Sequence, residues 1–251
     1  MPRFPYTLTG PIGHKATLGL IVLQVDETVE QDMRRVFADP GIATYVSRIP
    51  SGAELTPDTI DQMRLDLPRA TALLPPAAQF DVIAYACTSG TTLIGADQVA
   101  GLIRGAAQTR AVTNPLTATL AALQHLNVSR IGLVSPYIAS VADPMRHSFA
   151  THGIAVPQRL SFGEEVEARV ARIDPGSIHA AALQVGQPDE VEAVFLSCTN
   201  LRTLDIIEDL EQQLGKPVLS SNQALAWHMA HLAGLRQIRG DSPGALFRSD
   251  A

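Results

Sequence analysis

Short apolar runs alternate along this chain with stretches in which apolar residues recur at helical spacing. The runs predict buried strands at residues 17–25, 43–49, 80–87, 111–113, 130–137, 192–198 and 216–221. The amphipathic stretches predict four helices, at residues 26–37, at 56–74, from about residue 91 onward, and at 115–126. In the second of these, we expect Thr56 to cap the helix and Pro57 to occupy its first helical position. Continuous apolar strands that alternate with helices are typical of a parallel sheet covered on both faces, so we predict an α/β fold.

A weak internal repeat divides the chain into two α/β halves. The segment "DVIAYACTSGTTL" parallels "EAVFLSCTNLRTL", and "AVTNPLTATLAALQHLNV" parallels "PVLSSNQALAWHMAHLAGL". Each copy places a cysteine, Cys87 or Cys198, at the carboxyl end of a strand, which is the edge where open α/β sheets bind ligands. We predict halves of residues 1–115 with about 223–251, and of residues 116–222, with both cysteines facing one cleft between them.

Composition and charge narrow the class of protein. The chain is 46% hydrophobic and 18% charged, as ordinary globular proteins are, and its net charge is −6 with scattered lysines and arginines. This pattern argues against nucleic acid or an anionic membrane as a partner. No apolar leader or bilayer-length run is visible, which predicts the cytoplasm, where thiols stay reduced. A disulfide is therefore not expected, and two cysteines are too few for a Cys-rich zinc site.

The two cysteines admit a packing role or a chemical one. A single cysteine at a strand end is most often a small buried hydrophobe, but its recurrence in both halves, each time before threonine, favours chemistry. A helix N-terminus lowers a thiol's pKa, so one thiolate could remove a proton next to a carboxylate and the opposite thiol could return one. The resulting enediolate needs donors, which we expect at two helix N-termini: Thr88, Ser89 and Gly90 after the first cysteine, and Thr199 and Asn200 after the second. Alternatively, a thiolate could add to an activated double bond.

Five segments resemble the aspartate/glutamate racemase superfamily, and within it the branch of maleate cis-trans isomerases and arylmalonate decarboxylases. They are "GLIVLQVDETVEQD" (19–32), "AYACTSGT" (84–91), "LVSPYIASV" (133–141), "LSCTNLRTLDIIEDLEQQLGKPVLSSNQA" (196–224) and "GDSPGALF" (240–247). The resemblance implies two Rossmann-like halves related by a pseudo-twofold, with no metal and no organic cofactor. It implies that Cys87 and Cys198 are the catalytic pair, and that Thr88, Ser89 and Tyr137 bind a substrate carboxylate together with the backbone after Cys198. The decarboxylases keep only the second cysteine, so this chain looks more like the isomerases and racemases.

Two positions depart from the maleate isomerase pattern. Asp26 and Glu167 stand where those isomerases carry asparagines. Two carboxylates would repel a dianion such as maleate and would favour a substrate with a positive group, although Asp26 could equally serve only as a helix cap.

The hypothesis from sequence is a cofactor-independent racemase or isomerase acting next to the carboxylate of an amino acid or of a cyclic amidine acid, as in ectoine-type catabolism. Its rivals are maleate-type cis-trans isomerisation, decarboxylation and a non-catalytic small-molecule binding protein. We expect a small carboxylic acid as the only ligand, and a homo-oligomer, either a dimer or a tetramer.

Overall fold

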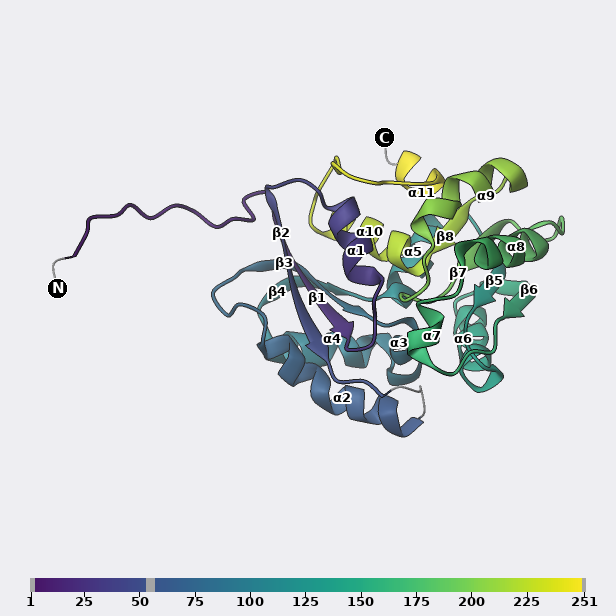
Figure 1. Ribbon diagram of the computed structural model, residues 1–251, viewed down its shortest axis with the longest axis horizontal. Helices are drawn as coiled ribbons and strands as arrows, with labels where there is room; N and C mark the ends of the chain where they lie inside the picture. The colour runs from purple at the N-terminus through teal and green to yellow at the C-terminus, as the bar shows by residue number, and fades with distance from the viewer. Residues whose placement is uncertain (1–2, 53–56, 250–251) are drawn as a thin grey trace.

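The computed structural model describes residues 3–52 and 57–249, which contain two four-stranded parallel sheets (Figure 1). The first sheet has the order β2-β1-β3-β4, formed by Ile42–Ile49, Ala16–Leu23, Phe80–Ala86 and Thr109–Thr113. The second has the order β6-β5-β7-β8, formed by Ala155–Ser161, Arg130–Ser135, Ala193–Leu196 and Val218–Ser220. The matching order of the two sheets agrees with the internal repeat, and the α/β prediction is confirmed.

Helices cover the sheets of both halves. In the first half they are α1 (Val29–Val36), α2 (Pro57–Ala72), α3 (Thr88–Ile94) and α4 (Ala96–Ala106). In the second half they are α6 (Ala139–Thr151), α7 (Glu167–Val170), α8 (Pro175–Gly186) and α9 (Ile207–Leu214), with the short 3-10 turn η1 (Leu204–Ile206) before α9. Helix α2 begins at the predicted Pro57, whereas its expected cap Thr56 lies outside the described residues.

Two further helices connect the halves. Helix α5 (Pro115–His125) and helix α10 (Ser221–Leu232) pack against each other, and α10 also contacts β3 and α1 of the first half. The chain closes with α11 (Ala245–Arg248), which lies against α10. Because the last long helix returns to the first half, the carboxyl ends of β3 and β7 are brought into the same region of the molecule. The exact boundary between the halves stays a prediction.

Burial explains why the strands form where they do. All eight residues of β1 are buried, as expected for a strand with helices on both faces. One apolar cluster joins the two sheets, with Leu20 of β1 and Leu133 of β5 among its members, and a second cluster fills the space between the first sheet and helices α2 and α4. The observed strands end one or two residues before the predicted ones at Cys87 and Cys198, because the chain turns there. No helix in the described ranges is long and apolar enough to cross a membrane.

Candidate active site

Cys87 caps the helix that follows it. Strand β3 ends at Ala86, and α3 starts at Thr88, three residues earlier than the sequence predicts. The Cys87 sulfur accepts a hydrogen bond from the Gly90 N–H at 3.2 Å and lies 3.6 Å from the Ser89 hydroxyl. A Cβ atom at Gly90 would lie 2.9 Å from that sulfur, so only glycine leaves room for the thiol. The cysteine is therefore held at a helix N-terminus, as predicted.

Cys198 has different local surroundings. The residues after it form a turn, and the next helical segment is η1 at Leu204, so the prediction of a helix N-terminus at Thr199 and Asn200 is wrong. Long-range contacts hold this turn: the Asn200 side-chain oxygen accepts from the Glu27 N–H at 2.9 Å, and its nitrogen donates to the Glu167 carbonyl at 3.1 Å. The φ angle of Cys198 is 156°, which residues with a side chain rarely adopt, and such strain is often found at functional sites.

Both cysteines lie where the two halves meet. The Cys198 N–H donates to the Ser221 hydroxyl at 3.1 Å, and the same hydroxyl is 3.0 Å from that of Thr88, the residue after Cys87. The Thr199 hydroxyl donates to the Ala86 carbonyl at 3.4 Å. These contacts bring the two cysteine-bearing turns together, although Cys87 and Cys198 pack against separate apolar clusters.

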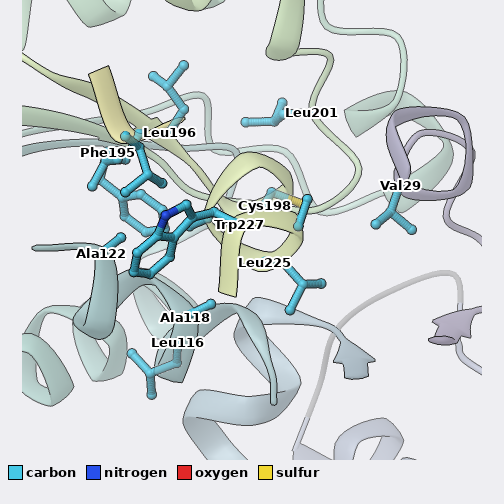
Figure 2. Close-up of a cluster of buried hydrophobic side chains, with 14 of the residues drawn as sticks. Val29, Leu116, Ala118, Ala122, Phe195, Leu196, Cys198, Leu201, Leu225 and Trp227 are labelled. Atoms are coloured by element: carbon cyan, nitrogen blue, oxygen red, sulfur yellow. The ribbon is translucent and has the colours of Figure 1, made fainter. Parts of the chain in front are cut away.

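The site is closed in this structure. Cys87 is 2% exposed and Cys198 is 4% exposed, and Figure 2 shows Cys198 among buried side chains that include Val29, Leu201 and Leu225. A surface depression of about 1030 Å³ lies elsewhere, beside Thr109 near the amino ends of the first sheet's strands.

Tyr137 follows β5 and faces the second cysteine. It is 3% exposed, and its hydroxyl lies close enough to the Cys198 thiol to lower the pKa of that thiol in part. Burial raises the pKa of Tyr137, and negative charge on Cys198, Glu167 and Cys87 would raise it further. The electrostatic influence of both cysteines on one tyrosine is a second sign that the thiols share a site. A neutral phenol in this position is a hydrogen-bond donor at all ordinary pH values.

Two buried carboxyl groups complete the cluster. Asp26 Oδ1 accepts from the Thr28 and Val29 N–H groups at 2.8 and 2.9 Å, which caps α1, while Oδ2 is buried with no donor in good geometry among the described residues. Burial raises the pKa of Asp26, and the nearby Thr199 hydroxyl lowers it in part. Burial also raises the pKa of Glu167 to about 7, and its Oε2 lies 3.4 Å from the Asn200 amide nitrogen. Asp26 thus uses only one of its two oxygens as a cap.

The thiols are protonated at rest. Burial raises the pKa of Cys87 to about 11, against the hydrogen bonds from Ser89 and Gly90, and the charge of Glu167 adds to the rise. Burial raises the pKa of Cys198 well above its ordinary value, and Glu167 and Asp26 both contribute in the same direction. The sequence-based expectation of a thiolate near neutral pH is therefore wrong for the closed state, because the cost of burying a charge exceeds the benefit of the helix N-terminus.

Three residues of the network escaped sequence reasoning. Ser221 links the two cysteine turns as described above, and Asn222 donates to the Thr199 carbonyl at 2.8 Å and to Asp32 Oδ2 at 2.7 Å. Burial raises the pKa of Asp32 to about 6. The internal repeat contained one indication of Ser221 and Asn222, because its second copy has Ser-Ser-Asn where the first copy has Asn-Pro-Leu. The described residues contain no group of three or more His, Cys, Asp or Glu placed to hold a metal ion.

Comparisons with known proteins agree with this fold. The family model for arylmalonate decarboxylase matches residues 19–247. The chain is 32% identical to arylmalonate decarboxylase from Bordetella bronchiseptica over 124 residues, which cover 49% of this chain and only about half (51%) of that enzyme. It is 25% identical to maleate isomerase from Nocardia farcinica over 244 residues, which cover 93% of this chain and 96% of that enzyme.

A solved structure gives the same result at the level of the fold. A cysteine-to-serine mutant of Nocardia farcinica maleate cis-trans isomerase, with a covalently bound succinylcysteine intermediate, superimposes with a TM-score of 0.84 at 23% identity. The match covers 94% of this chain and 99% of that one. Both kinds of relative are enzymes. Because the family model spans nearly the whole chain, this protein belongs to the arylmalonate decarboxylase family.

Proposed function

We propose that this protein is a cofactor-independent racemase or isomerase that moves a proton at the carbon next to a carboxylate. The observation that carries the proposal is the meeting of Cys87 and Cys198, from opposite halves, at one buried polar cluster bridged by Ser221. One thiolate takes the α-proton and becomes a thiol, leaving an enediolate. The second thiol then gives its proton to the opposite face of that carbon and becomes a thiolate, so one proton is lost and one is gained.

Donors around the cysteines suit the enediolate. The Tyr137 phenol stays neutral and close to Cys198, and the hydroxyls of Thr88, Ser89 and Thr199 are buried beside the two turns. Fixed donors in a site without water stabilise a developing oxyanion strongly because they need no reorganisation. We assign these four residues to the substrate carboxylate.

The acids favour a substrate with a positive group. Asp26 Oδ2 has no strong partner among the described residues, and Glu167 lies near both thiols. A bound ammonium or amidinium group would satisfy Asp26 and would offset the negative charges that raise the thiol pKa values. Binding of such a substrate would therefore favour loss of one thiol proton to solvent, and the thiolate left behind takes the α-proton. An amino acid or a cyclic amidine acid, as in ectoine-type catabolism, has both the required carboxylate and the required cation.

A deuterium-exchange experiment tests this function. The protein is incubated in D₂O with aspartate, glutamate, a cyclic amidine carboxylic acid, maleate and phenylmalonate, and each acid is followed by NMR. We expect deuterium at the α-carbon of a cationic acid, with loss of the reaction in both Cys87→Ala and Cys198→Ala. Exchange that survives both substitutions would refute the cysteine-pair mechanism.

Maleate isomerisation is the second candidate. The Nocardia farcinica maleate isomerase aligns with almost the whole chain, and its cysteine-to-serine mutant carries a succinylcysteine, which supports cysteine addition to an alkene. The pKa of Glu167, about 7, leaves much of that side chain uncharged near neutral pH, which reduces the repulsion of a dianion. Conversion of maleate to fumarate in the same experiment, without α-exchange of any cationic acid, would favour this candidate. Loss of carbon dioxide from phenylmalonate would favour decarboxylation.

A further inference from the structure

Ser221 makes contacts that its place in the fold does not require. It is the first residue of α10, it is fully buried, and its hydroxyl touches a group from each cysteine-bearing turn. The start of α10 is already satisfied by Ser220, whose hydroxyl accepts from the Gln223 N–H and whose own N–H donates back to the Gln223 side chain. The corresponding first position of α5 is Pro115, which has no hydroxyl. Helix initiation therefore does not explain the Ser221 hydroxyl.

The hydrogen bonds of Ser221 allow its hydroxyl to donate its proton to Thr88. A hydroxyl has one proton and two acceptor sites, and the Cys198 N–H occupies one acceptor site of Ser221. If Ser221 donates its proton to the Thr88 oxygen, the Thr88 proton is free to point at another acceptor. The chain then runs from a fixed backbone N–H through two hydroxyls, and each bond polarises the next. A substrate carboxylate is the acceptor that this chain would serve.

The same contacts fix the distance between the halves at the site. Thr88 follows Cys87 directly, and Ser221 holds the backbone nitrogen of Cys198. One buried oxygen thus ties the turn of the first cysteine to the turn of the second. Loss of that oxygen would leave the Cys198 N–H and the Thr88 hydroxyl without their partner in a dry environment, which is costly.

We propose that Ser221 is a positioning residue that keeps the two cysteine turns in register and aims the Thr88 hydroxyl at the substrate carboxylate. The register part stands on the contacts alone, whereas the carboxylate part rests on the proposed function. The two parts need separate experiments.

Alkylation tests the register without any substrate. Wild-type protein, Ser221→Ala and the matched control Ser220→Ala are treated with iodoacetamide at pH 8, and labelling is resolved by mass spectrometry of tryptic peptides, since Cys87 and Cys198 fall in different ones. We expect Ser221→Ala to speed the labelling of both cysteines at least threefold, and Ser221→Thr, which keeps the hydroxyl, to restore slow labelling. Ser220→Ala should lower Tm without this change. Equal labelling in wild type and Ser221→Ala, or acceleration in both alanine variants, would overturn the register role.

Glycine protection tests the carboxylate part, because glycine carries one carboxylate and one ammonium group. Protection of Cys87 from iodoacetamide by glycine gives a Kd for wild type, Ser221→Ala, Thr88→Val and the double variant. We expect about tenfold weaker binding in each single variant and no further loss in the double variant, because both remove the same chain. Additive losses, or no protection of the wild type, would overturn the assignment. Failure of the proposed function would give a different result. Wild-type protein would then show no deuterium exchange at the α-carbon of any acid, while the alkylation and protection experiments would still give the results expected above.

Discussion

The turns of Cys87 and Cys198 share the dipeptide Cys-Thr, which follows Ala86 in one turn and Ser197 in the other. The two sulfur atoms nevertheless have different environments. The first half surrounds its sulfur with a helix N-terminus and the Ser89 hydroxyl. The second half surrounds its sulfur with a turn, the Tyr137 phenol and the charges of Glu167 and Asp26. The internal repeat thus gives the two cysteines equivalent positions after a strand, whereas the environment of each thiol depends on residues that differ between the halves.

This difference concerns the charges near each thiol. Glu167 raises the pKa of both cysteines, and Asp26 is a further charge that raises the pKa of Cys198. Hydrogen bonds lower both values in part, from Ser89 and Gly90 at Cys87 and from Tyr137 and Asn200 at Cys198. Cys198 gains more from a cationic substrate, because both acids that oppose its ionisation would be neutralised.

Removal of either cysteine should have the largest effect and tests whether the two are equally necessary. In Cys87→Ala or Cys198→Ala, racemisation should fall by about 10³-fold, because each direction needs a base on one face and an acid on the other. The measurement is the rate of optical change of the substrate found by deuterium exchange. Full racemisation by either single variant would show that one half is enough.

Glu167→Gln should weaken the contrast between the halves and change the pH dependence of stability. The folded pKa of Glu167, about 7, lies above its ordinary value of 4.5, so the folded state favours the protonated form. This contribution is fully present below pH 4.5 and is lost as pH rises through 7. Chemical denaturation should therefore find the variant more stable than wild type by about 1–3 kcal/mol at pH 8, with little difference at about pH 4.5. A constant difference across this range would contradict the assigned shift.

Asp26→Asn should separate capping from substrate binding. Asparagine keeps the oxygen that accepts from Thr28 and Val29 and removes a charge that burial disfavours, so Tm should not fall. It removes the negative charge, so KM for a cationic acid should rise about tenfold, as expected for loss of a charge-assisted hydrogen bond. KM for a carboxylic acid that has no cationic group should stay constant or fall. An unchanged KM for the cationic acid would restrict Asp26 to its cap.

Sequence reasoning predicted the fold correctly and predicted that both cysteines follow strands, because these features depend on local patterns. Buried parallel strands read as continuous apolar runs, and the repeat placed Cys87 and Cys198 at equivalent strand ends. The errors lie where distant residues decide: the turn after Cys198 is held by Glu27 and Glu167, and burial in the folded protein raises both thiol pKa values. Ser221 carried too weak a local signal, since a serine at a helix start is common.

The smallest expected effect concerns one of the ion pairs that join the halves at the surface. The Arg172 guanidinium binds both carboxylate oxygens of Glu27, at 2.7 and 3.2 Å, and Glu27 is the neighbour of Asp26. Both side chains are about half exposed, so Arg172→Ala should lower the free energy of unfolding by less than about 1 kcal/mol. Arg159, which pairs with Asp143 inside the second half, offers a matched control of similar exposure.

The two arginine variants should differ in access to the thiols rather than in stability. If the pair between the halves helps to keep the site closed, Arg172→Ala should speed iodoacetamide labelling of both cysteines about twofold, and Arg159→Ala should not. Added salt screens exposed charges, so about 0.5 M NaCl should bring wild type close to Arg172→Ala. Equal acceleration of labelling in both variants would mean that loss of either ion pair loosens the protein in general. The difference between the two cysteine sites would then depend only on their buried residues.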